Sequence, residues 1–335
     1  MHLGCPEAGV GQLANKIFDE RDFEYAAHEI KEFLGTFDLE SFKRKCLDHD
    51  VGILYKNSSE LESLTDLIVE RICSRTPFSL LRAGDGEGNV LSLTLPRSLP
   101  ECDMKCLNLM FHIMDRQAVS LSDGESISSS MASAFENADV IGTRLFRHGD
   151  EKGAFDETSW FLAALSDGEI RGSVGALKAI QFLDSLVSKN KVRGRILTSA
   201  WIHLYLIGKL DKLIESAESL VVISGRRELA AIFLNRYKNK IIEFIDIPLQ
   251  ASECKVNDRV KHYPGHYVEV ISKLQKNLCG ALVLVGAGIF GKIYCDIAKK
   301  SGGIAVDMGS AFDLLAGHST RPIHRGIDVE SIKWI

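Results

Sequence analysis

Two acidic residues spaced one position apart follow a short apolar segment in the first third of the chain. Residues 78–81 read Phe-Ser-Leu-Leu, and Arg82, Asp85 and Glu87 follow among glycines. Carboxylate oxygens suit Mg²⁺ or Mn²⁺, which usually bind one or two protein carboxylates together with substrate phosphates. A cation held by Asp85 and Glu87 could neutralise a departing diphosphate, and Arg82 could pair with a phosphate or with those carboxylates. The pattern therefore predicts a site for a divalent cation and a phosphorylated ligand.

The Asp-x-Glu spacing alone is weak evidence, because the chain contains it six times. The triplet at Asp85 differs from the others, since it follows a predicted strand and is surrounded by glycines. Gly84 and Gly86 would make the turn flexible, and both are candidate nucleotide contacts together with Arg82. A solvated turn without chemistry is the competing interpretation.

A glycine-rich turn near the end of the chain carries a second chemical signal. The apolar segment 281–285 leads into Gly286 and Gly288, which begin a Gly-x-Gly-x-x-Gly pattern followed by Lys292. Asp307 ends the next apolar segment, about 20 residues further on, which matches a dinucleotide-binding fingerprint. Glycines let a phosphate approach the backbone, and the start of the following helix attracts its charge. All four residues are therefore candidate nucleotide contacts, and a turn shaped only for packing is the alternative.

The position of this fingerprint argues against an ordinary dehydrogenase. In nicotinamide-dependent enzymes the motif usually opens the nucleotide-binding domain, with the rest of that fold behind it. Here only a short segment follows Asp307. The NAD(P) interpretation is weakened, while nucleotide binding in general is not.

A third polar turn follows another predicted strand. Ser224, Gly225 and Arg226 come after the apolar residues 221–223 and precede a predicted helix. A turn of this kind could hold a phosphate or a ribose. A capped helix start with surface arginines is an equally good interpretation.

The catalytic base is not assigned by the sequence. Asp246 lies near the end of a predicted strand, Asp313 follows the last strand, and His203 lies just beyond another. Each could accept a proton from an attacking hydroxyl group. No Ser-His-Asp or Cys-His arrangement can be assembled from the sequence order.

The elements that must position these residues are short apolar segments alternating with helical segments. This alternation predicts a parallel sheet with right-handed crossovers, and such sheets bind ligands at the carboxyl ends of their strands. We therefore expect an α/β, Rossmann-like fold with a mostly parallel sheet flanked by helices. The predicted strands are 78–81, 140–142, 196–198, 221–224, 241–247, 281–285 and 304–307. The predicted helices in this region are 160–165, 175–187, 227–237, 267–278 and 289–300, and 120–130 is a loop or a helix start.

The first 75 residues show a different pattern. Apolar residues recur at helical spacing between Phe18 and Leu34 and again between Leu61 and Ile72. We expect a helical N-terminal extension over residues 1–75 and a single nucleotide-binding domain over residues 76–335.

Composition and charge limit the classes of function. The net charge of −5 and the isoelectric point near 6.1 argue against broad nucleic-acid binding, which needs a basic face. No signal peptide is recognisable, and no apolar run approaches the roughly 20 residues that span a bilayer. The eight scattered cysteines are typical of free thiols in a reducing compartment. We expect a cytoplasmic enzyme; peripheral membrane contact and the oligomeric state stay open.

Several of these segments resemble one known family. Arg82-Ala-Gly-Asp-Gly-Glu87 resembles the Arg-Phe-Gly-Asp-Gly-Glu signature of the GT-D-fold glycosyltransferases, which are bacterial sugar transferases. Residues 284–294 and 302–310 are similar to the closing βαβ unit of that family, and the resemblance covers about residues 75 to 320. Ala83 departs from the aromatic residue usual at its position, which concerns packing around the motif.

The resemblance implies a metal-dependent transfer of a sugar, of the hexosyltransferase type, as in polysaccharide biosynthesis. The donor would be a nucleotide sugar, often a UDP-sugar, and the acceptor a hydroxyl group of a glycan or of a lipid-linked molecule. Asp85 and Glu87 would bind Mn²⁺ or Mg²⁺ at the donor diphosphate, with Arg82 and Gly84 supporting the loop. Gly286, Gly288 and Lys292 would border the donor site. The alternatives are an NAD(P)-dependent oxidoreductase and a non-catalytic nucleotide-binding protein.

Overall fold

The structure is a computed structural model of the chain. It describes residues 17–96, 100–115, 117–146, 170–250, 260–321, 324 and 327–334. The helix predicted over residues 160–165 lies outside these ranges.

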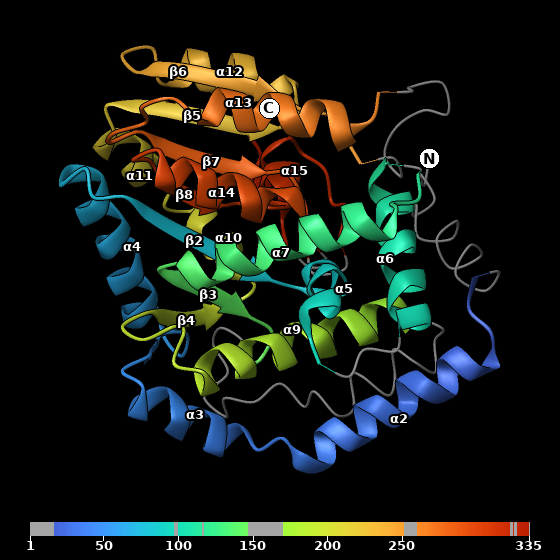
Figure 1. Ribbon diagram of the computed structural model, residues 1–335. Helices are drawn as coiled ribbons and strands as arrows, with labels where there is room; N and C mark the ends of the chain where they lie inside the picture. Colours follow the sequence, from blue (N-terminus) through green and yellow to red (C-terminus); the bar gives the residue numbers. More distant parts are fainter. Residues whose placement is uncertain are drawn as a thin grey trace.

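A single parallel sheet forms the centre of the described structure (Figure 1). Its eight strands run in the order β1-β4-β3-β2-β8-β7-β5-β6, and every pairing is parallel. The α/β fold with a parallel sheet is therefore confirmed. The strands are β1 (Gly52–Ile53), β2 (Phe78–Ala83), β3 (Val140–Thr143), β4 (Ile196–Ser199), β5 (Ser219–Ser224), β6 (Ile241–Asp246), β7 (Leu282–Gly286) and β8 (Ile304–Asp307).

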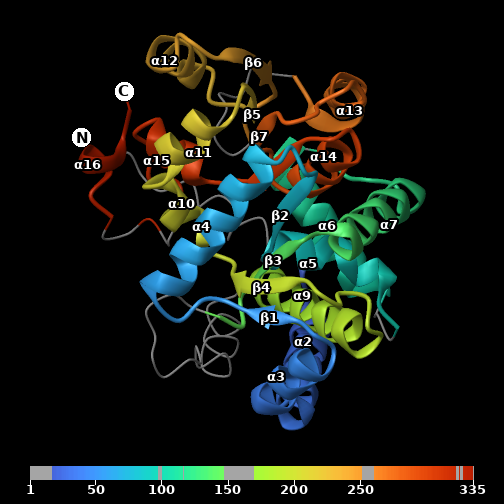
Figure 2. The same ribbon diagram turned by 90° about the vertical axis from the view of Figure 1, so that its left-hand side faces the viewer.

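Helices cover both faces of the sheet, as the turned view shows (Figure 2). Neighbouring residues of one strand point to opposite cores: Leu81 packs with the first helix layer and Leu80 with the second. Burial on both sides explains why the inner strands read as continuous apolar runs. The first layer contains α5 (Asp85–Leu91), α7 (Leu121–Asn137), α9 (Ile170–Ser188), α13 (Tyr267–Leu274) and α14 (Phe290–Lys300). The second contains α4 (Ser58–Cys73), α10 (Ile202–Ile207), α11 (Leu210–Ser216), α12 (Glu228–Arg236) and α15 (Ala311–Leu315), with the short α16 (Val329–Ile332) against α15.

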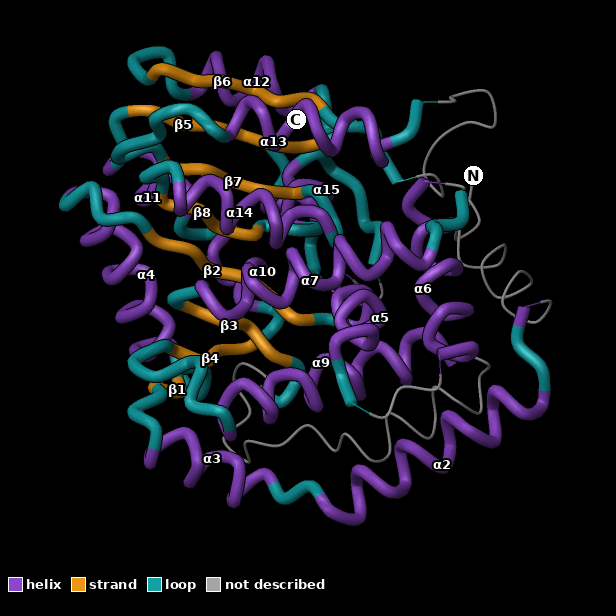
Figure 3. Tube along the Cα trace, in the orientation of Figure 1, coloured by secondary structure: helices purple, strands orange, loops and turns teal. Residues whose placement is uncertain are grey.

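The N-terminal helices precede the first strand, as the sequence predicts. Both α2 (Glu20–Thr36) and α3 (Leu39–Asp48) begin at aspartate caps and lie outside α9 (Figure 3). Their buried residues include Ile30 and Phe42, which join the core of the first helix layer. The two-residue strand β1 follows and pairs with β4 at the sheet edge. This strand is too short to leave a periodic signal in the sequence.

Two further helices complete the layer near the predicted site. The polar segment after Ser120 is a helix, α7, because the Ser120 hydroxyl caps it and one face packs on the core. The helix α6 (Pro100–Asp115), which the sequence pattern does not reveal, packs against α5 and α9. Within the described ranges, no helix is long and apolar enough to cross a membrane.

The carboxyl ends of the strands meet in register on one edge of the sheet. Ala83 of β2 pairs with Thr143 of β3, which pairs with Ser199 of β4. On the other half, Ser224 of β5 pairs with Gly286 of β7. From β5 the chain continues to β6 at the edge of the sheet, whereas from the neighbouring β7 it continues to β8 nearer the centre. The two connections therefore run in opposite directions from adjacent strands. Such switch points are where open α/β sheets bind ligands.

Candidate functional site

The acidic motif forms the start of a helix and not the flexible turn expected from its glycines. Gly84 follows β2, and α5 begins at Asp85, so both carboxylates lie in the first helical turn. A Cβ atom at Gly88 would lie 1.6 Å from the carbonyl oxygen of Gly175 in α9, and one at Gly175 would lie 2.1 Å from the carbonyl oxygen of Asp85. These glycines let α5 and α9 touch backbone to backbone. The expected flexible turn was wrong, because residues 85–91 are helical and Gly88 serves close packing against α9.

Both carboxylate oxygens of Glu87 have partners inside the protein. The Gly84 amide donates to Oε2 at 2.8 Å, which caps the helix, and the Lys292 ammonium lies 2.6 Å from Oε1. The Glu87 side chain is only 11% exposed. Its negative charge is therefore compensated by a residue of α14.

Lys292 links the acidic motif to the end of β8. Its ammonium also lies 3.0 Å from Asp307 Oδ2 and donates to the Gly288 carbonyl at 3.1 Å. Three oxygen atoms, from Glu87, Asp307 and Gly288, thus surround the ammonium group. Burial alone would lower the pKa of Lys292, but Asp307 and Glu87 outweigh it and raise the pKa above its usual value.

Arg82 and Asp307 form a second buried ion pair beside Lys292. The Arg82 Nε atom lies 3.2 Å from Asp307 Oδ2, and Asp307 is fully buried. Burial opposes ionisation, but Arg82 and Lys292 hold the pKa of Asp307 below its usual value. Arg82 also donates to the Ala200 carbonyl and reaches His203 Nδ1 at 2.8 Å. These contacts fix the Arg82 guanidinium beneath the strand ends.

Asp85, in contrast, remains accessible at the mouth of the site. Its side chain is 35% exposed, and Arg171 Nη1 lies 2.8 Å from Oδ2. Arg144 Nη1 lies 3.8 Å from Oδ1. Partial burial works against ionisation, yet Arg171 and Arg144 hold the pKa of Asp85 below its usual value.

Sequence analysis missed both arginines. Arg144 directly follows β3, so the rule that ligands lie at strand ends could have found it. Arg171, near the start of α9, follows no predicted strand and carries no comparable signal.

The two carboxylates differ in how well they fit a divalent cation. Within the ranges the structure covers, no cluster of three or more His, Cys, Asp or Glu side chains could hold a metal. A cation at Glu87 would meet the Lys292 ammonium 2.6 Å from Oε1 and be repelled by it. Asp85 is partly exposed and could serve as the single protein ligand beside substrate phosphates, a common arrangement for Mg²⁺. Asp85 is therefore the more accessible carboxylate for a cation, and a cation there would compete with Arg171 at 2.8 Å and Arg144 at 3.8 Å.

The glycine-rich turn after β7 is tightly packed. A Cβ atom at Gly286 would lie 2.5 Å from the Phe312 ring, and one at Gly288 would lie 2.5 Å from Met114 Cε. Gly288 also has a φ of +54°, a conformation that favours glycine. Packing alone therefore requires both glycines, whatever ligand the turn also contacts.

The turn after β5 is closed by its own contacts. The Ser224 hydroxyl accepts from the Arg226 amide at 3.1 Å, and Arg226 Nε lies 2.7 Å from Asp313 Oδ1. A Cβ atom at Gly225 would lie 3.1 Å from the Ile247 carbonyl oxygen. Arg226 is therefore buried against Asp313.

The three candidate bases have different surroundings. Asp313 is bound by Arg226 and by the Thr320 hydroxyl at 2.5 Å, and His203 is buried against Arg82. Asp246, at the end of the edge strand β6, is 43% exposed and lies 2.8 Å from the exposed Arg227. The structure thus joins His203 and Asp313 to buried networks and leaves Asp246 the most accessible.

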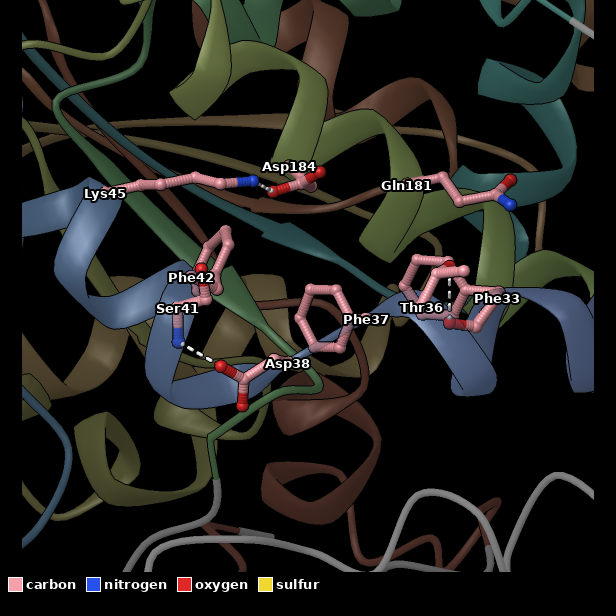
Figure 4. Close-up of a pocket in the computed structure, with 9 residues that line it drawn as sticks. All are labelled: Phe33, Thr36, Phe37, Asp38, Ser41, Phe42, Lys45, Gln181 and Asp184. Atoms are coloured by element: carbon pink, nitrogen blue, oxygen red, sulfur yellow. Dashed lines mark hydrogen bonds and ion pairs between the residues drawn. The ribbon is translucent and has the colours of Figure 1, made fainter.

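A separate pocket of about 300 Å³ lies among the outer helices α2, α3 and α9 (Figure 4). Its wall includes Phe37 and Phe42, and the Lys45 ammonium points to Asp184 at 3.0 Å. None of the residues singled out from the sequence lines it, so it is distinct from the site at the strand ends. The full lining is Phe33, Thr36, Phe37, Asp38, Ser41, Phe42, Lys45, Gln181 and Asp184.

Residues 59–315 match the family described as GT-D fold-like domain. The match runs from α4 to the end of α15, so it includes β2 to β8 and the motif at Asp85. No curated protein and no solved structure matches the chain. Because the match extends over well over half of the 335 residues, the chain belongs to the GT-D fold-like domain family.

Proposed function

We propose that this protein is a glycosyltransferase that transfers a sugar from a nucleoside-diphosphate sugar to a hydroxyl group of a glycan or lipid-linked acceptor. Membership of the GT-D fold-like domain family supports a glycosyltransferase-like activity in general. The observation that carries the donor class is the position of Asp85, exposed at the end of β2 between two arginines. UDP-sugars are the first donors to test.

Arg144 and Arg171 are suited to a diphosphate. Two guanidinium groups, those of Arg144 and Arg171, face the carboxylate of Asp85 from two different elements. Arginine binds phosphate oxygens through paired hydrogen bonds and keeps its charge at any physiological pH. Charged groups fixed in this way stabilise the negative charge that develops on a departing diphosphate.

A divalent cation, Mn²⁺ or Mg²⁺, would be held by Asp85 together with the donor phosphates. When bound, such a cation supplies charge stabilisation to the leaving diphosphate. Glu87 supports the same site differently, because it caps α5 and holds Lys292. Arg82, Lys292 and Asp307 then form the buried floor beneath the phosphates.

Asp246 is the most exposed of the three candidate bases, but β8, β7 and β5 lie between its strand and β2, which leads to Asp85. The Asp246 side chain is 43% exposed at the carboxyl end of β6, whereas Asp313 and His203 are held by buried partners. A base must lie within hydrogen-bond reach of the proton it removes, so none of the three residues is assigned as the base.

The contacts of Asp307 give the NAD(P)-dependent alternative no support. In that fold the acidic residue after the second strand binds a ribose hydroxyl group. Asp307 is fully buried and holds Arg82 and Lys292. A non-catalytic nucleotide-binding protein would bind the same nucleotide, so only a measurement of catalytic turnover distinguishes it from the proposed transferase.

An assay of UDP release from UDP-glucose, UDP-galactose and the UDP-N-acetylhexosamines tests the proposal. Slow hydrolysis of one donor without an acceptor is the expected background, and it should need Mn²⁺ or Mg²⁺. Asp85→Asn should abolish release, while Asp123→Asn, in a second Asp-Gly-Glu triplet, should retain it. Reduction of NAD⁺ or NADP⁺ by alcohol substrates, with no hydrolysis of any nucleotide sugar, would overturn the proposal.

A further inference from the structure

A chain of hydrogen bonds leads from Arg82 to the loop after β8. Arg82 Nη1 lies 2.8 Å from His203 Nδ1, and His203 Nε2 lies 3.4 Å from the Ser310 hydroxyl oxygen. On the other side, His324 Nε2 lies 3.1 Å from the same oxygen, and the Thr320 amide donates to His324 Nδ1 at 3.2 Å. Ser310 is therefore placed between two imidazole rings.

The first partner fixes the tautomer of His203. A guanidinium group can only donate, so the Nδ1 atom facing Arg82 must accept. Burial and the Arg82 charge hold the pKa of His203 well below its usual value, so the ring is neutral. Its single proton is then on Nε2, which donates toward Ser310.

The same reasoning fixes the tautomer of His324. The backbone amide of Thr320 can only donate, so His324 Nδ1 accepts. Burial lowers the pKa of His324 to about 4, which keeps this ring neutral at pH 7. Its proton is also on Nε2 and also points to Ser310.

Ser310 consequently accepts two hydrogen bonds and has its own proton left to donate. A hydroxyl group has two lone pairs and one hydrogen, and the two imidazoles occupy both lone pairs. Among the residues that the structure describes, no acceptor for this hydrogen is present. The side chain is partly exposed and comes directly after Gly309, whose Cβ, if present, would lie 1.7 Å from Arg82 Nη2. Ser310 is thus an obligatory donor beside the buried floor of the site.

We propose that Ser310 binds the diphosphate of the sugar donor by donating its hydroxyl proton to a phosphate oxygen. This inference rests on the proposed function. A phosphate oxygen accepts without donating, which matches a hydroxyl group that can only donate. The position at the carboxyl end of β8, beside Arg82, is where a parallel sheet of this kind holds phosphates.

Binding of UDP and of inorganic pyrophosphate, measured by calorimetry with and without Mn²⁺, tests the contact. Ser310→Ala should weaken both by about tenfold or more, because a hydrogen bond to a charged group is lost. Ser331→Ala is the matched control, since the Ser331 hydroxyl already donates to the Asp328 carbonyl, and it should bind as the unmodified protein does. Equal affinities of Ser310→Ala and the unmodified protein would overturn the inference alone. Absence of all binding by the unmodified protein would overturn the proposed function and the inference with it.

The tautomers give a second test that needs no ligand. Nitrogen-15 NMR spectra, assigned with His203→Gln and His324→Gln, should show both rings protonated at Nε2. A proton on Nδ1 of His324 would contradict the inference, because the Ser310 proton would then be used by His324 Nε2.

Discussion

The Lys292 ammonium lies 2.6 Å from a carboxylate oxygen of Glu87, and both side chains are almost completely buried. The pair joins the acidic motif after β2 to the helix α14 after β7. The positive charge that faces Glu87 is the ammonium group of Lys292. Glu87 therefore has a structural partner inside the protein, whereas Asp85 is partly exposed.

Lys292→Met should destabilise the protein strongly. The change leaves the charges of Glu87 and Asp307 buried with less compensation, and breaking a buried pair costs about 3–5 kcal/mol. Chemical denaturation measures the loss. Lys273→Met, which breaks an exposed pair with Glu269 on one helix, should cost much less, because solvent screens that pair. Similar losses in the two variants would argue against a buried cation at the site.

The energetic link between Glu87 and Lys292 can be measured directly. In a double-mutant cycle of Glu87→Gln and Lys292→Met, the sum of the losses of unfolding free energy in the two single variants should exceed the loss in the double variant. Residues in one ion-pair network typically show a coupling of about 0.5–3 kcal/mol. Simple additivity of the two changes would contradict the contact.

Gly88→Ala should destabilise the contact between α5 and α9. The new Cβ atom would lie 1.6 Å from the Gly175 carbonyl oxygen, so one helix must move. At Gly35 in α2, a Cβ atom would meet nothing within 4 Å, and Gly35→Ala should stabilise the protein by about 0.5–1 kcal/mol. Thermal unfolding should therefore shift in opposite directions for the two variants. A rise in the unfolding temperature of Gly88→Ala would show that the helices do not touch at Gly88.

Stability should fall as the pH decreases below about 6.5, partly through His262. Burial lowers the pKa of His262 to about 3, so between pH 6.5 and 3 the unfolded chain binds a proton that the folded state does not. The contribution of the neutral His262 to the free energy of unfolding is complete above pH 6.5. It decreases by up to about 1.4 kcal/mol per pH unit as the pH falls towards 3.

His262→Gln should flatten this part of the pH profile of the unfolding free energy. An unchanged slope in His262→Gln would show that His262 becomes protonated in the folded state within this range.

The sheet was largely predictable from the sequence, because burial on both faces leaves continuous apolar runs. The strands β5 and β7 are of this kind, and each was predicted within two residues of its bounds. The helix α5 was missed because glycines that serve contact with Gly175 look like glycines of a turn. The local sequence pattern does not distinguish glycines of a turn from glycines that allow two helices to pack closely.

The sequence indicated which residues lie at the candidate site, but not which of them form ion pairs with one another. Strand ends pointed to Arg82, Asp85 and Asp307, and the structure places all three at the same edge of the sheet. That Glu87 binds Lys292, more than 200 positions away in the chain, follows from the strand order and could not be read locally. The metal role expected for Glu87 therefore stays a prediction that its buried contacts disfavour.

The most direct test of the account is calorimetric titration of UDP with and without Mn²⁺. The unmodified protein and the Asp123→Asn control should bind UDP more tightly with Mn²⁺ than without it. In Asp85→Asn, the effect of Mn²⁺ should disappear while the unfolding free energy changes little. Binding of UDP that is equally tight in Asp85→Asn, or that never depends on the metal, would contradict the central claim that Asp85 binds the donor diphosphate through a divalent cation.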